Sequence, residues 1–296
     1  RAAVAPRLAA ATGIQQTAVT GAQQIEQLSA ALDAGTPAEE AVPQLFPFPL
    51  DEFQLASLRA LEAERSVVVS APTGSGKTVI AEVAIYLGLA RGGRIVYTTP
   101  LKALSNQKYQ DLQKRFGRER VGLMTGDACL NADSDILVMT TEVFRNMLLE
   151  DDQARLAGVS YVVLDEFHYM NDPSRGTVWE ECCILCPPSA RIIALSATMS
   201  NAEQIAQWLS AIHAPTELVA SDFRPVPLRY SYADSLGIEP LFASSSSGPG
   251  GGSNTTGLSL RKRGKKWKIN PDVLPERRLA LAAEKRGGGG GGGGGG

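Results

Sequence analysis

Residues 71–78, with the sequence APTGSGKT, place two glycines, a lysine and a threonine at the spacing of a phosphate-binding loop. They follow an apolar run, 66–70, and precede a helix-like stretch, 78–90. The glycines let the backbone curl around an anion, and the helix N-terminus adds partial positive charge. The segment therefore predicts a site for a nucleoside triphosphate. The residues expected to contact the phosphates are Thr73, Gly74, Ser75, Gly76, Lys77 and Thr78.

Two adjacent acids, Asp165 and Glu166, end a second apolar run, 159–164. An acid at the end of a buried strand is the usual partner of a phosphate-binding loop. We expect Asp165 and the hydroxyl of Thr78 to hold Mg²⁺. We expect Glu166 to deprotonate the attacking water, and Lys77 to bind the β- and γ-phosphates. A merely solvated pair of acids is the alternative, and the loop upstream disfavours it.

Short apolar runs alternate with helical patterns along the middle of the chain. The predicted strands are 66–70, 94–98, 121–124, 135–139, 159–164 and 191–195. The predicted helices are 53–64, 78–90, 102–116, 141–149, 176–185 and 202–212. This alternation predicts an α/β fold with a parallel, doubly wound sheet and helices on both faces. In such sheets ligands bind beyond the carboxyl ends of the strands, where the polar motifs lie.

Six segments, in order, resemble the motifs of superfamily 2 helicases of the DExH-box group. Besides 71–78 they are 98–104 (TTPLKAL), 125–127 (TGD), 140–142 (TTE), 165–168 (DEFH) and 196–198 (SAT). The resemblance implies a RecA-like P-loop domain over about 46–232 that hydrolyses ATP with Mg²⁺ and binds single-stranded or partly duplex RNA. The implied nucleic-acid contacts are Pro100, Leu101, Lys102, Asn106, Gln107, Thr125, Gly126, Asp127, Thr140, Thr141 and Glu142. The residues implied to couple the γ-phosphate to the nucleic acid are His168, Ser196, Ala197 and Thr198.

Within that group the chain is most similar to the superkiller-type RNA helicases. Residues 48–54 (FPLDEFQ) resemble their adenine-reading segment, which implies that Phe48 stacks on the base and Gln54 bonds its edge. Residues 102–108, 175–181 and 224–228 are similar to further segments of the group, and 165–172 (DEFHYMND) resembles the plant chloroplast member, the increased-size-exclusion-limit type. Two other functions stay open: an RNA-binding module with vestigial hydrolysis, and a DNA translocase of the same superfamily.

The ends of the chain have a different composition from its middle. Residues 1–45 are low in charge and read as an organelle-targeting remnant or as a short helix over 14–32. Residues 233–296 read as a linker and a disordered, basic and glycine-rich tail. Complete helicases of the group carry a second RecA-like domain with a Gln-x-x-Gly-Arg-x-Gly-Arg motif. No such motif follows residue 232, so we expect that domain to be missing from this chain.

The composition is that of an ordinary globular protein, with 44 % hydrophobic and 20 % charged residues in 296. No apolar run approaches the ~18 residues that a membrane span needs. The net charge is −2, yet 257–286 holds ten Lys or Arg and three Asp or Glu. That segment suits nucleic acid or a solvated end equally. The cysteines near 182–186 are expected to be reduced core thiols. We expect an intracellular location: the resemblance suggests the chloroplast, with nucleus or cytoplasm as alternatives.

Overall fold

The computed structural model describes residues 20–150, 152–226, 229–234, 237–241, 259–262, 265–268, 270, 273, 274 and 278. The chain divides into two units, 1–225 and 226–296, and each is described by itself. The part of the N-terminal region before residue 20 lies outside the described residues, as do two parts of the expected linker and tail: the serine- and glycine-rich stretch 244–257 and the final glycine run, 287–296.

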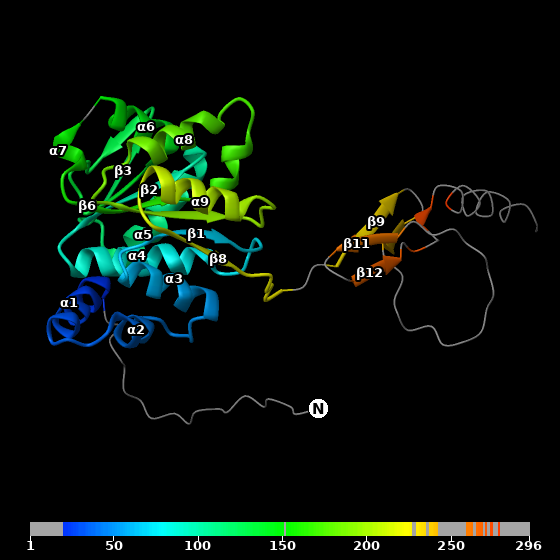
Figure 1. Cartoon of the computed structure of the whole chain (residues 1–296), viewed down its shortest axis with the longest axis horizontal. Coiled ribbons are helices and arrows are strands. Elements are labelled where there is room, and N and C mark those ends of the chain that lie inside the picture. Colours follow the sequence, from blue (N-terminus) through cyan, green and yellow to red (C-terminus); the bar gives the residue numbers. More distant parts are fainter. Residues whose placement is uncertain are drawn as a thin grey trace, which may run out of the picture. The chain divides into compact units, whose positions relative to one another are not determined.

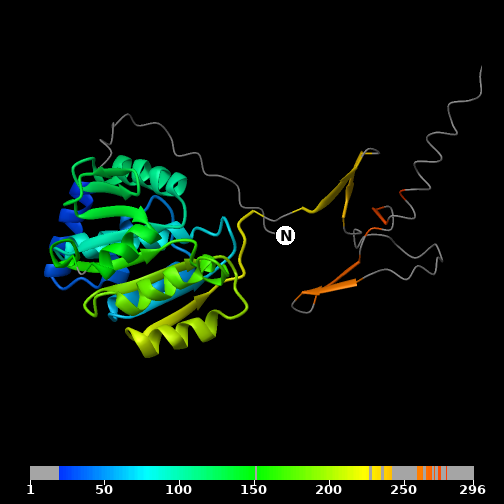
Figure 2. The ribbon, with the colours of Figure 1, turned by 90° about the horizontal axis from the view of Figure 1, so that it is seen from above.

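An eight-stranded sheet forms the centre of the first unit (Figures 1 and 2). Its strands are β1 (Ser66–Ser70), β2 (Arg94–Thr99), β3 (Val121–Thr125), β4 (Ala128–Leu130), β5 (Ile136–Thr140), β6 (Val159–Leu164), β7 (Arg191–Ser196) and β8 (Thr216–Ala220). Their order is β4-β3-β5-β2-β6-β7-β1-β8, and every neighbouring pair is parallel except β3 and β4. The predicted parallel α/β sheet is therefore confirmed, with one short antiparallel strand at an edge.

Helices cover both faces of this sheet, and Figure 1 shows α6, α7 and α8 on one side and α1 to α4 on the other. The helices of the first unit are α1 (Gly21–Asp33), α2 (Ala38–Ala41), η1 (Val42–Leu45), α3 (Glu52–Glu62), α4 (Lys77–Ala90), α5 (Lys102–Phe116), α6 (Thr141–Leu149), α7 (Gln153–Leu156), η2 (Phe167–Asn171), α8 (Gly176–Leu185) and α9 (Ala202–Ile212). Here η marks a 3₁₀-helix.

Successive residues of the central strands enter two separate hydrophobic cores, because side chains alternate across a sheet. In β6, Tyr161 and Val163 pack with α1, α3, α4 and α5, whereas Val162 and Leu164 pack with α6, α8 and α9. The continuous apolar strands that the sequence contains are thus explained by burial on both faces. This rigid, two-sided core fixes the strand ends that carry the polar motifs.

The strands and helices predicted between 53 and 212 are present with small shifts of their ends, at most one residue for strands and two for helices. Of the alternative helix over 14–32, the described part is α1 (Gly21–Asp33). The sequence patterns missed β4 and β8. Strand β8 is the edge strand TELVA and is only partly buried, so it lacks the apolar run of a central strand. Strand β4 has three residues, too few for a pattern. Asp51 is the N-cap residue of α3.

Among its described residues the second unit contains two short hairpins, which lie almost entirely in the region, 233–296, that the sequence indicated as a linker and disordered tail. They pair β9 (Ser231–Asp234) with β10 (Gly237–Pro240), and β11 (Ser259–Lys262) with β12 (Lys265–Lys268). Antiparallel pairing needs only backbone donors and acceptors, and these polar segments carry no apolar alternation that would have predicted them. Among the described residues, no helix is both long and apolar enough to cross a membrane.

Three of the four cysteines lie in the core, as their apolar surroundings in the sequence indicated. Cys182, Cys183 and Cys186 are buried, whereas Cys129 on β4 is exposed. Burial raises the pKa of Cys186 to about 12, and it raises those of Cys182 and Cys183 as well. These thiols stay protonated and are shielded from reagents at neutral pH.

We therefore expect iodoacetamide to modify the native protein at Cys129 alone. Mass spectrometry of the digested protein would identify the modified cysteine. A Cys129→Ser variant should stay unmodified until denaturant is added. Equal native reactivity of Cys182 or Cys183 would contradict their placement in the core.

Candidate nucleotide site and adjoining polar edge

The carboxyl ends of five neighbouring parallel strands meet along one edge of the sheet. In spatial order these are β5, β2, β6, β7 and β1. The segments that follow them are 140–142, 100–104, 165–168, 196–198 and 71–78. This edge therefore brings together the phosphate-binding loop, the acidic pair and most segments expected to contact nucleic acid.

The loop 71–78 has the backbone geometry of an anion cradle. Gly74 and Gly76 have φ of 79° and 92°, the left-handed region that other residues rarely adopt. Gly76 is also the N-cap of α4, so the helix N-terminus faces the loop. The Ser75 hydroxyl is buried in the loop and has no hydrogen-bond partner among the described residues.

Lys77 folds back onto the same loop. Its Nζ donates to the carbonyls of Ala71 at 2.9 Å and Pro72 at 3.0 Å. Partial burial lowers the pKa of Lys77, and the nearby Glu166 and Asp165 carboxylates oppose that shift. An anion in the cradle would give the ammonium a better partner than two neutral carbonyls. The loop thus fits the phosphates of a nucleotide.

The carboxylate of Asp165 is held by donors from three directions. Its Oδ2 accepts a hydrogen bond from the Tyr97 hydroxyl at 2.7 Å, and its Oδ1 accepts one from the Glu166 N–H at 2.9 Å. The Lys108 Nζ lies 4.0 Å from Oδ2 and donates to the Thr78 hydroxyl at 3.2 Å. One cation therefore contacts both residues expected to bind Mg²⁺, and their oxygens are the hard ligands that this ion prefers.

Tyr97 is fixed as a donor to this carboxylate. It is fully buried in β2, and burial, followed by the negative charge of Asp165, raises its pKa well above the usual value. The phenol consequently keeps its proton at neutral pH and orients Asp165 toward the loop.

Glu166 has an unusual backbone conformation. Its φ of 52° and ψ of 44° lie in the left-handed region, which costs roughly 1–3 kcal/mol for a residue that has a side chain. The turn points its carboxylate away from β6, and Oε2 lies 3.4 Å from the Nδ1 of His168. The expected base and one expected coupling residue are therefore neighbours.

The segment after β7 is joined directly to the phosphate-binding strand. The Ala71 N–H donates to the Ser196 carbonyl at 3.2 Å, and the Met199 N–H donates to the Ser70 hydroxyl at 3.2 Å. The Ser196 hydroxyl is buried and lacks a hydrogen-bond partner within the described residues. Thr198 is exposed. A change at the phosphate loop would reach this segment through two hydrogen bonds.

The segment expected to read the adenine, 48–54, braces the loop. The Gln54 side chain is buried, accepts from the Asp51 N–H at 2.8 Å and donates to the Gly76 carbonyl at 3.1 Å. A Cβ on Gly76 would lie 2.8 Å from this amide. Phe48 is 45 % exposed, with its ring 5.7 Å from that of Phe46, so one face is free to stack. Base contacts by Phe48 and Gln54 stay predictions.

The residues expected to contact nucleic acid fall into two groups. The exposed ones are Leu101, Lys102, Asn106, Gln107, Gly126 and Asp127, with Thr125 partly exposed beside them. Lys102 Nζ lies 3.0 Å from Asp127 Oδ1, which also accepts from the Thr125 hydroxyl at 2.9 Å. These two contacts lower the pKa of Asp127. The structure therefore brings 100–107 and 125–127 together on one surface.

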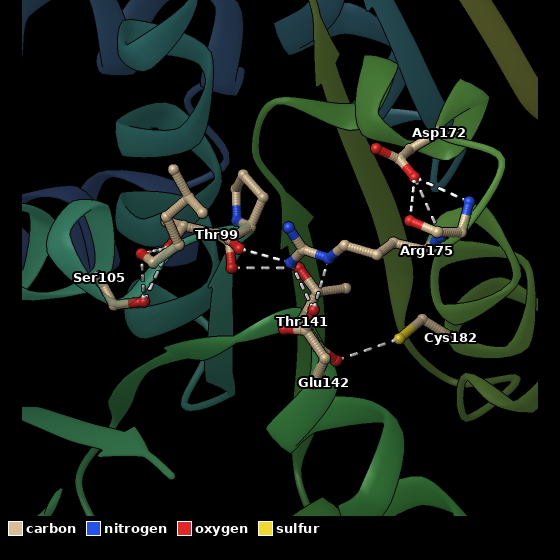
Figure 3. Close-up of polar contacts among 10 residues, drawn as sticks. Thr99, Ser105, Thr141, Glu142, Asp172, Arg175 and Cys182 are labelled. Carbon is tan, nitrogen blue, oxygen red and sulfur yellow. Dashed lines mark hydrogen bonds and ion pairs between the residues drawn. The ribbon is translucent and has the colours of Figure 1, made fainter. Parts of the chain in front are cut away.

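The other group faces inward. Pro100, Thr140 and Thr141 are buried, and Thr141 Oγ1 donates to the Thr99 carbonyl at 3.2 Å. Glu142 is partly buried and pairs with Arg175, as Figure 3 shows. The side chains of Thr141 and Glu142 are thus engaged within the fold, and the buried side chains of Pro100 and Thr140 leave only their backbone for any contact with nucleic acid.

Three residues of the site escaped the sequence patterns. Tyr97 looks like an ordinary core aromatic in a strand. Lys108 lies in the helicase-like segment 102–108, but its contact with Asp165 depends on the packing of α5 against β2, β3 and β5. Arg224, in the segment 224–228, donates from Nη1 to the Thr73 carbonyl at 3.1 Å. For Lys108, the available signal in the sequence was its place in the helicase-like segment, six residues after Lys102.

Comparison with known proteins gives one family match: the model described as DEAD/DEAH box helicase matches residues 51–205. The probable helicase HelY of Mycobacterium leprae is 54 % identical over 182 residues, which are 62 % of this chain and 20 % of that protein. The chloroplastic DExH-box ATP-dependent RNA helicase DExH15 of Arabidopsis thaliana is 48 % identical over 202 residues, 67 % of this chain and 17 % of that protein. The ATP-dependent RNA helicase mtr4 of Schizosaccharomyces pombe is 49 % identical over 186 residues, 62 % and 16 % respectively.

The chain thus spans about a fifth of the length of these curated relatives or somewhat less. Among solved structures, the DUF1998 helicase MrfA bound to DNA is similar with a TM-score of 0.53 and 20 % identity. That likeness covers 67 % of this chain and 29 % of the other, and it supports the fold alone.

The contacts of Lys108 predict that it competes with a divalent cation. A Lys108→Met variant removes the charge that compensates Asp165 and leaves the Thr78 hydroxyl free. Without nucleotide, Mn²⁺ should bind this variant about 3- to 10-fold more tightly than the wild type. Electron paramagnetic resonance of free Mn²⁺ would measure the affinity. Lys114→Met, a charge removal at an exposed position of the same helix, is the control, and weaker Mn²⁺ binding by the Lys108 variant would contradict the idea.

Proposed function

This chain belongs to the DEAD/DEAH box helicase family, and we propose that its first unit is the ATP-binding motor domain of an ATP-dependent RNA helicase. The observation that carries the proposal is the convergence of Thr78 and Asp165 on one cation position beside the phosphate loop, now taken by Lys108 Nζ. A hydroxyl and a carboxylate so placed are the protein ligands of Mg²⁺ in P-loop enzymes.

In this mechanism the loop 71–78 and the N-terminus of α4 bind the phosphates, and Lys77 exchanges its carbonyl partners for phosphate oxygens. Thr78 and Asp165 would hold Mg²⁺, with Tyr97 orienting the carboxylate, and the ion would neutralise negative charge that develops during phosphoryl transfer. Glu166 takes a proton from the attacking water. Bound ATP supplies the phosphoryl group that is transferred to this water.

Coupling to nucleic acid would run along the strand ends. Ser196 is hydrogen-bonded through its backbone to the phosphate loop, and His168 lies beside Glu166. Both lie at the carboxyl edge of the sheet. On the same edge, the neighbouring strand β2 is followed by the exposed Lys102. We propose that these residues, with Ala197 and Thr198, relay the state of the γ-phosphate.

RNA is the proposed substrate because two of the relatives carry RNA helicase in their names. The exposed amides, hydroxyl and lysine also suit phosphate and ribose contacts along a single strand, which do not depend on base sequence. Unwinding requires a second RecA-like domain to close the cleft, and the greater length of the relatives supports its presence in the whole protein. The word chloroplastic in one relative's name supports a chloroplast location.

The alternatives have specific weaknesses. Vestigial hydrolysis is disfavoured by the complete set of Lys77, Thr78, Asp165 and Glu166. A DNA translocase finds support only in a structural likeness that is too distant to carry a substrate.

Exchange of the two acids should separate metal binding from hydrolysis. Glu166→Gln should keep the affinity for a fluorescent ATP analogue within about twofold and lower ATP turnover by at least ~100-fold, because it removes the base alone. Asp165→Asn should instead abolish most of the dependence of analogue binding on Mg²⁺. Glu180→Gln, at an exposed position of α8, is the control. Identical defects of the two acids in Mg²⁺ titrations would refute their different roles.

Lys102 should contribute one phosphate contact. In Lys102→Ala, affinity for single-stranded RNA should fall, and the slope of log affinity against log salt should decrease by about 0.7. Fluorescence anisotropy over a salt series measures both quantities, and Lys114→Ala is the matched control on the same helix. A single-stranded DNA of the same sequence forms a second arm. Stronger binding of DNA than of RNA would favour the translocase.

A further inference from the structure

One segment similar to the helicase group has no part in the function proposed above. It is 175–181 (RGTVWEE), at the start of α8. Its arginine is the N-cap residue of α8 and lies four residues beyond the end of η2, the 3₁₀-helix that begins directly after Glu166. Arg175 therefore belongs to the same connection as the acidic pair.

The side chain of Arg175 is held in place by residues near it in the sequence, in η2, in the turn that follows and in α8. Asp172 Oδ1 accepts from the backbone N–H groups of Ser174 at 2.8 Å and Arg175 at 3.1 Å. The guanidinium carbon lies 5.8 Å from the ring centre of Tyr169 and 5.6 Å from that of Trp179. These rings and the turn leave the guanidinium little freedom, so that it reaches outward in one direction.

The direction in which it points is toward the loops of the nucleic-acid surface. Arg175 Nη2 donates to the Pro100 carbonyl at 2.7 Å, and Nε donates to Glu142 Oε1 at 3.2 Å, with Nη2 paired to the same carboxylate (Figure 3). Pro100 belongs to the loop between β2 and α5, and Glu142 to the first turn of α6. One planar group thus ties the loop that follows β2 to the start of the helix that follows β5.

Hydrogen bonds between those loops complete the network. Thr141 Oγ1 donates to the Thr99 carbonyl, and the Thr99 hydroxyl bonds the Ser105 hydroxyl at 2.7 Å (Figure 3). Ser105 is in the first turn of α5, which also carries Lys102. The position of Lys102 therefore depends on the segment that Arg175 holds.

We propose that Arg175 is a positioning residue of the nucleic-acid site, which fixes the loop before α5 and the start of α6 relative to the segment that follows Glu166. The proposal rests on the function proposed above, because it concerns the same surface. It also assigns Glu142 a different role from the one that the helicase resemblance implied. Its carboxylate would repel a phosphate, and here it anchors the guanidinium.

The geometry requires arginine at this position. The guanidinium presents a rigid fork of donors, so it bonds a carbonyl and a carboxylate at once and lies flat against the rings. A lysine ammonium is a point charge on a flexible stem and would reach one of these partners while releasing the other. Arg175→Lys therefore removes the bridge and keeps the charge.

The test compares four full-length proteins: wild type, Arg175→Lys, Glu142→Gln and Arg145→Lys. Arg145 is the matched control, because its Nη1 lies 3.2 Å from Glu181 Oε2 and joins the same two helices, α6 and α8, without touching the loop at Pro100. Hydrogen exchange of peptides covering 99–105 and 140–145 reads the anchoring directly. Fluorescence anisotropy reads the affinity for a single-stranded RNA, and a fluorescent ATP analogue reads the nucleotide site.

We expect faster exchange of both peptides and about tenfold weaker RNA binding in Arg175→Lys and Glu142→Gln. Affinity for the ATP analogue should stay within about twofold in both, and Arg145→Lys should match the wild type in all three measurements. All proteins retain the basic segment 257–286, so its contribution to RNA binding cancels in the comparison.

The outcomes separate the two proposals. A wild type that binds no RNA would overturn the proposed function, and with it this role. RNA binding by the wild type that is equal in Arg175→Lys, or an equal loss in Arg145→Lys, would overturn the role of Arg175 alone. Unchanged hydrogen exchange in Arg175→Lys would show that the bridge does not hold the loops.

Discussion

The carboxylate of Asp165 imposes the constraint on which the site depends. It is mostly buried at the end of a central strand, where an ionised group is stable only if donors surround it. Those donors come from β2, from α5 and from the following backbone amide. To stabilise this one negative charge, the Tyr97 hydroxyl must lie within hydrogen-bond distance of it, α5 must bring Lys108 near it, and the chain must turn so that the Glu166 N–H points to it. The strain of that turn is offset by the rigid core beneath it.

Charge compensation also orders the surface expected to bind nucleic acid. Each acid in that region has a basic partner within the fold, Asp127 with Lys102 and Glu142 with Arg175. Ion pairs that are at least partly exposed contribute little to stability, so their effect is on the position and availability of charge. Lys102 is exposed and could exchange its partner for a phosphate, whereas Arg175 has its donors engaged by the loops. The Lys102–Asp127 pair therefore keeps a charge available for binding, whereas the Arg175–Glu142 pair holds the structure of the surface.

The sequence predicted those parts of the protein whose signal is local. The loop 71–78, the acidic pair and the central strands depend on runs of a few residues, and the structure has these elements with their ends shifted by at most one residue for strands and two for helices. The partners of Asp165 were missed because Tyr97 and Lys108 reach it only through the tertiary packing of β2 and α5. Thr140 and Thr141 were expected to face nucleic acid, but their backbone lies where β5 enters α6, and the hydroxyl of Thr141 turns inward. No periodic pattern in the sequence distinguishes a hydroxyl that faces nucleic acid from one that turns into the protein at this position.

The alternation of the two cores has a consequence for how this chain can vary in length. Asp165 continues the row of Tyr161 and Val163, which face α4 and α5, and it is this row that leads to Tyr97 and Lys108. Loss or gain of one residue within β6 would transfer the carboxylate to the opposite face, among the apolar side chains packed by α6 and α8. A single-residue insertion or deletion within β6 would therefore reverse the facing of Asp165, and only changes by two residues would preserve it.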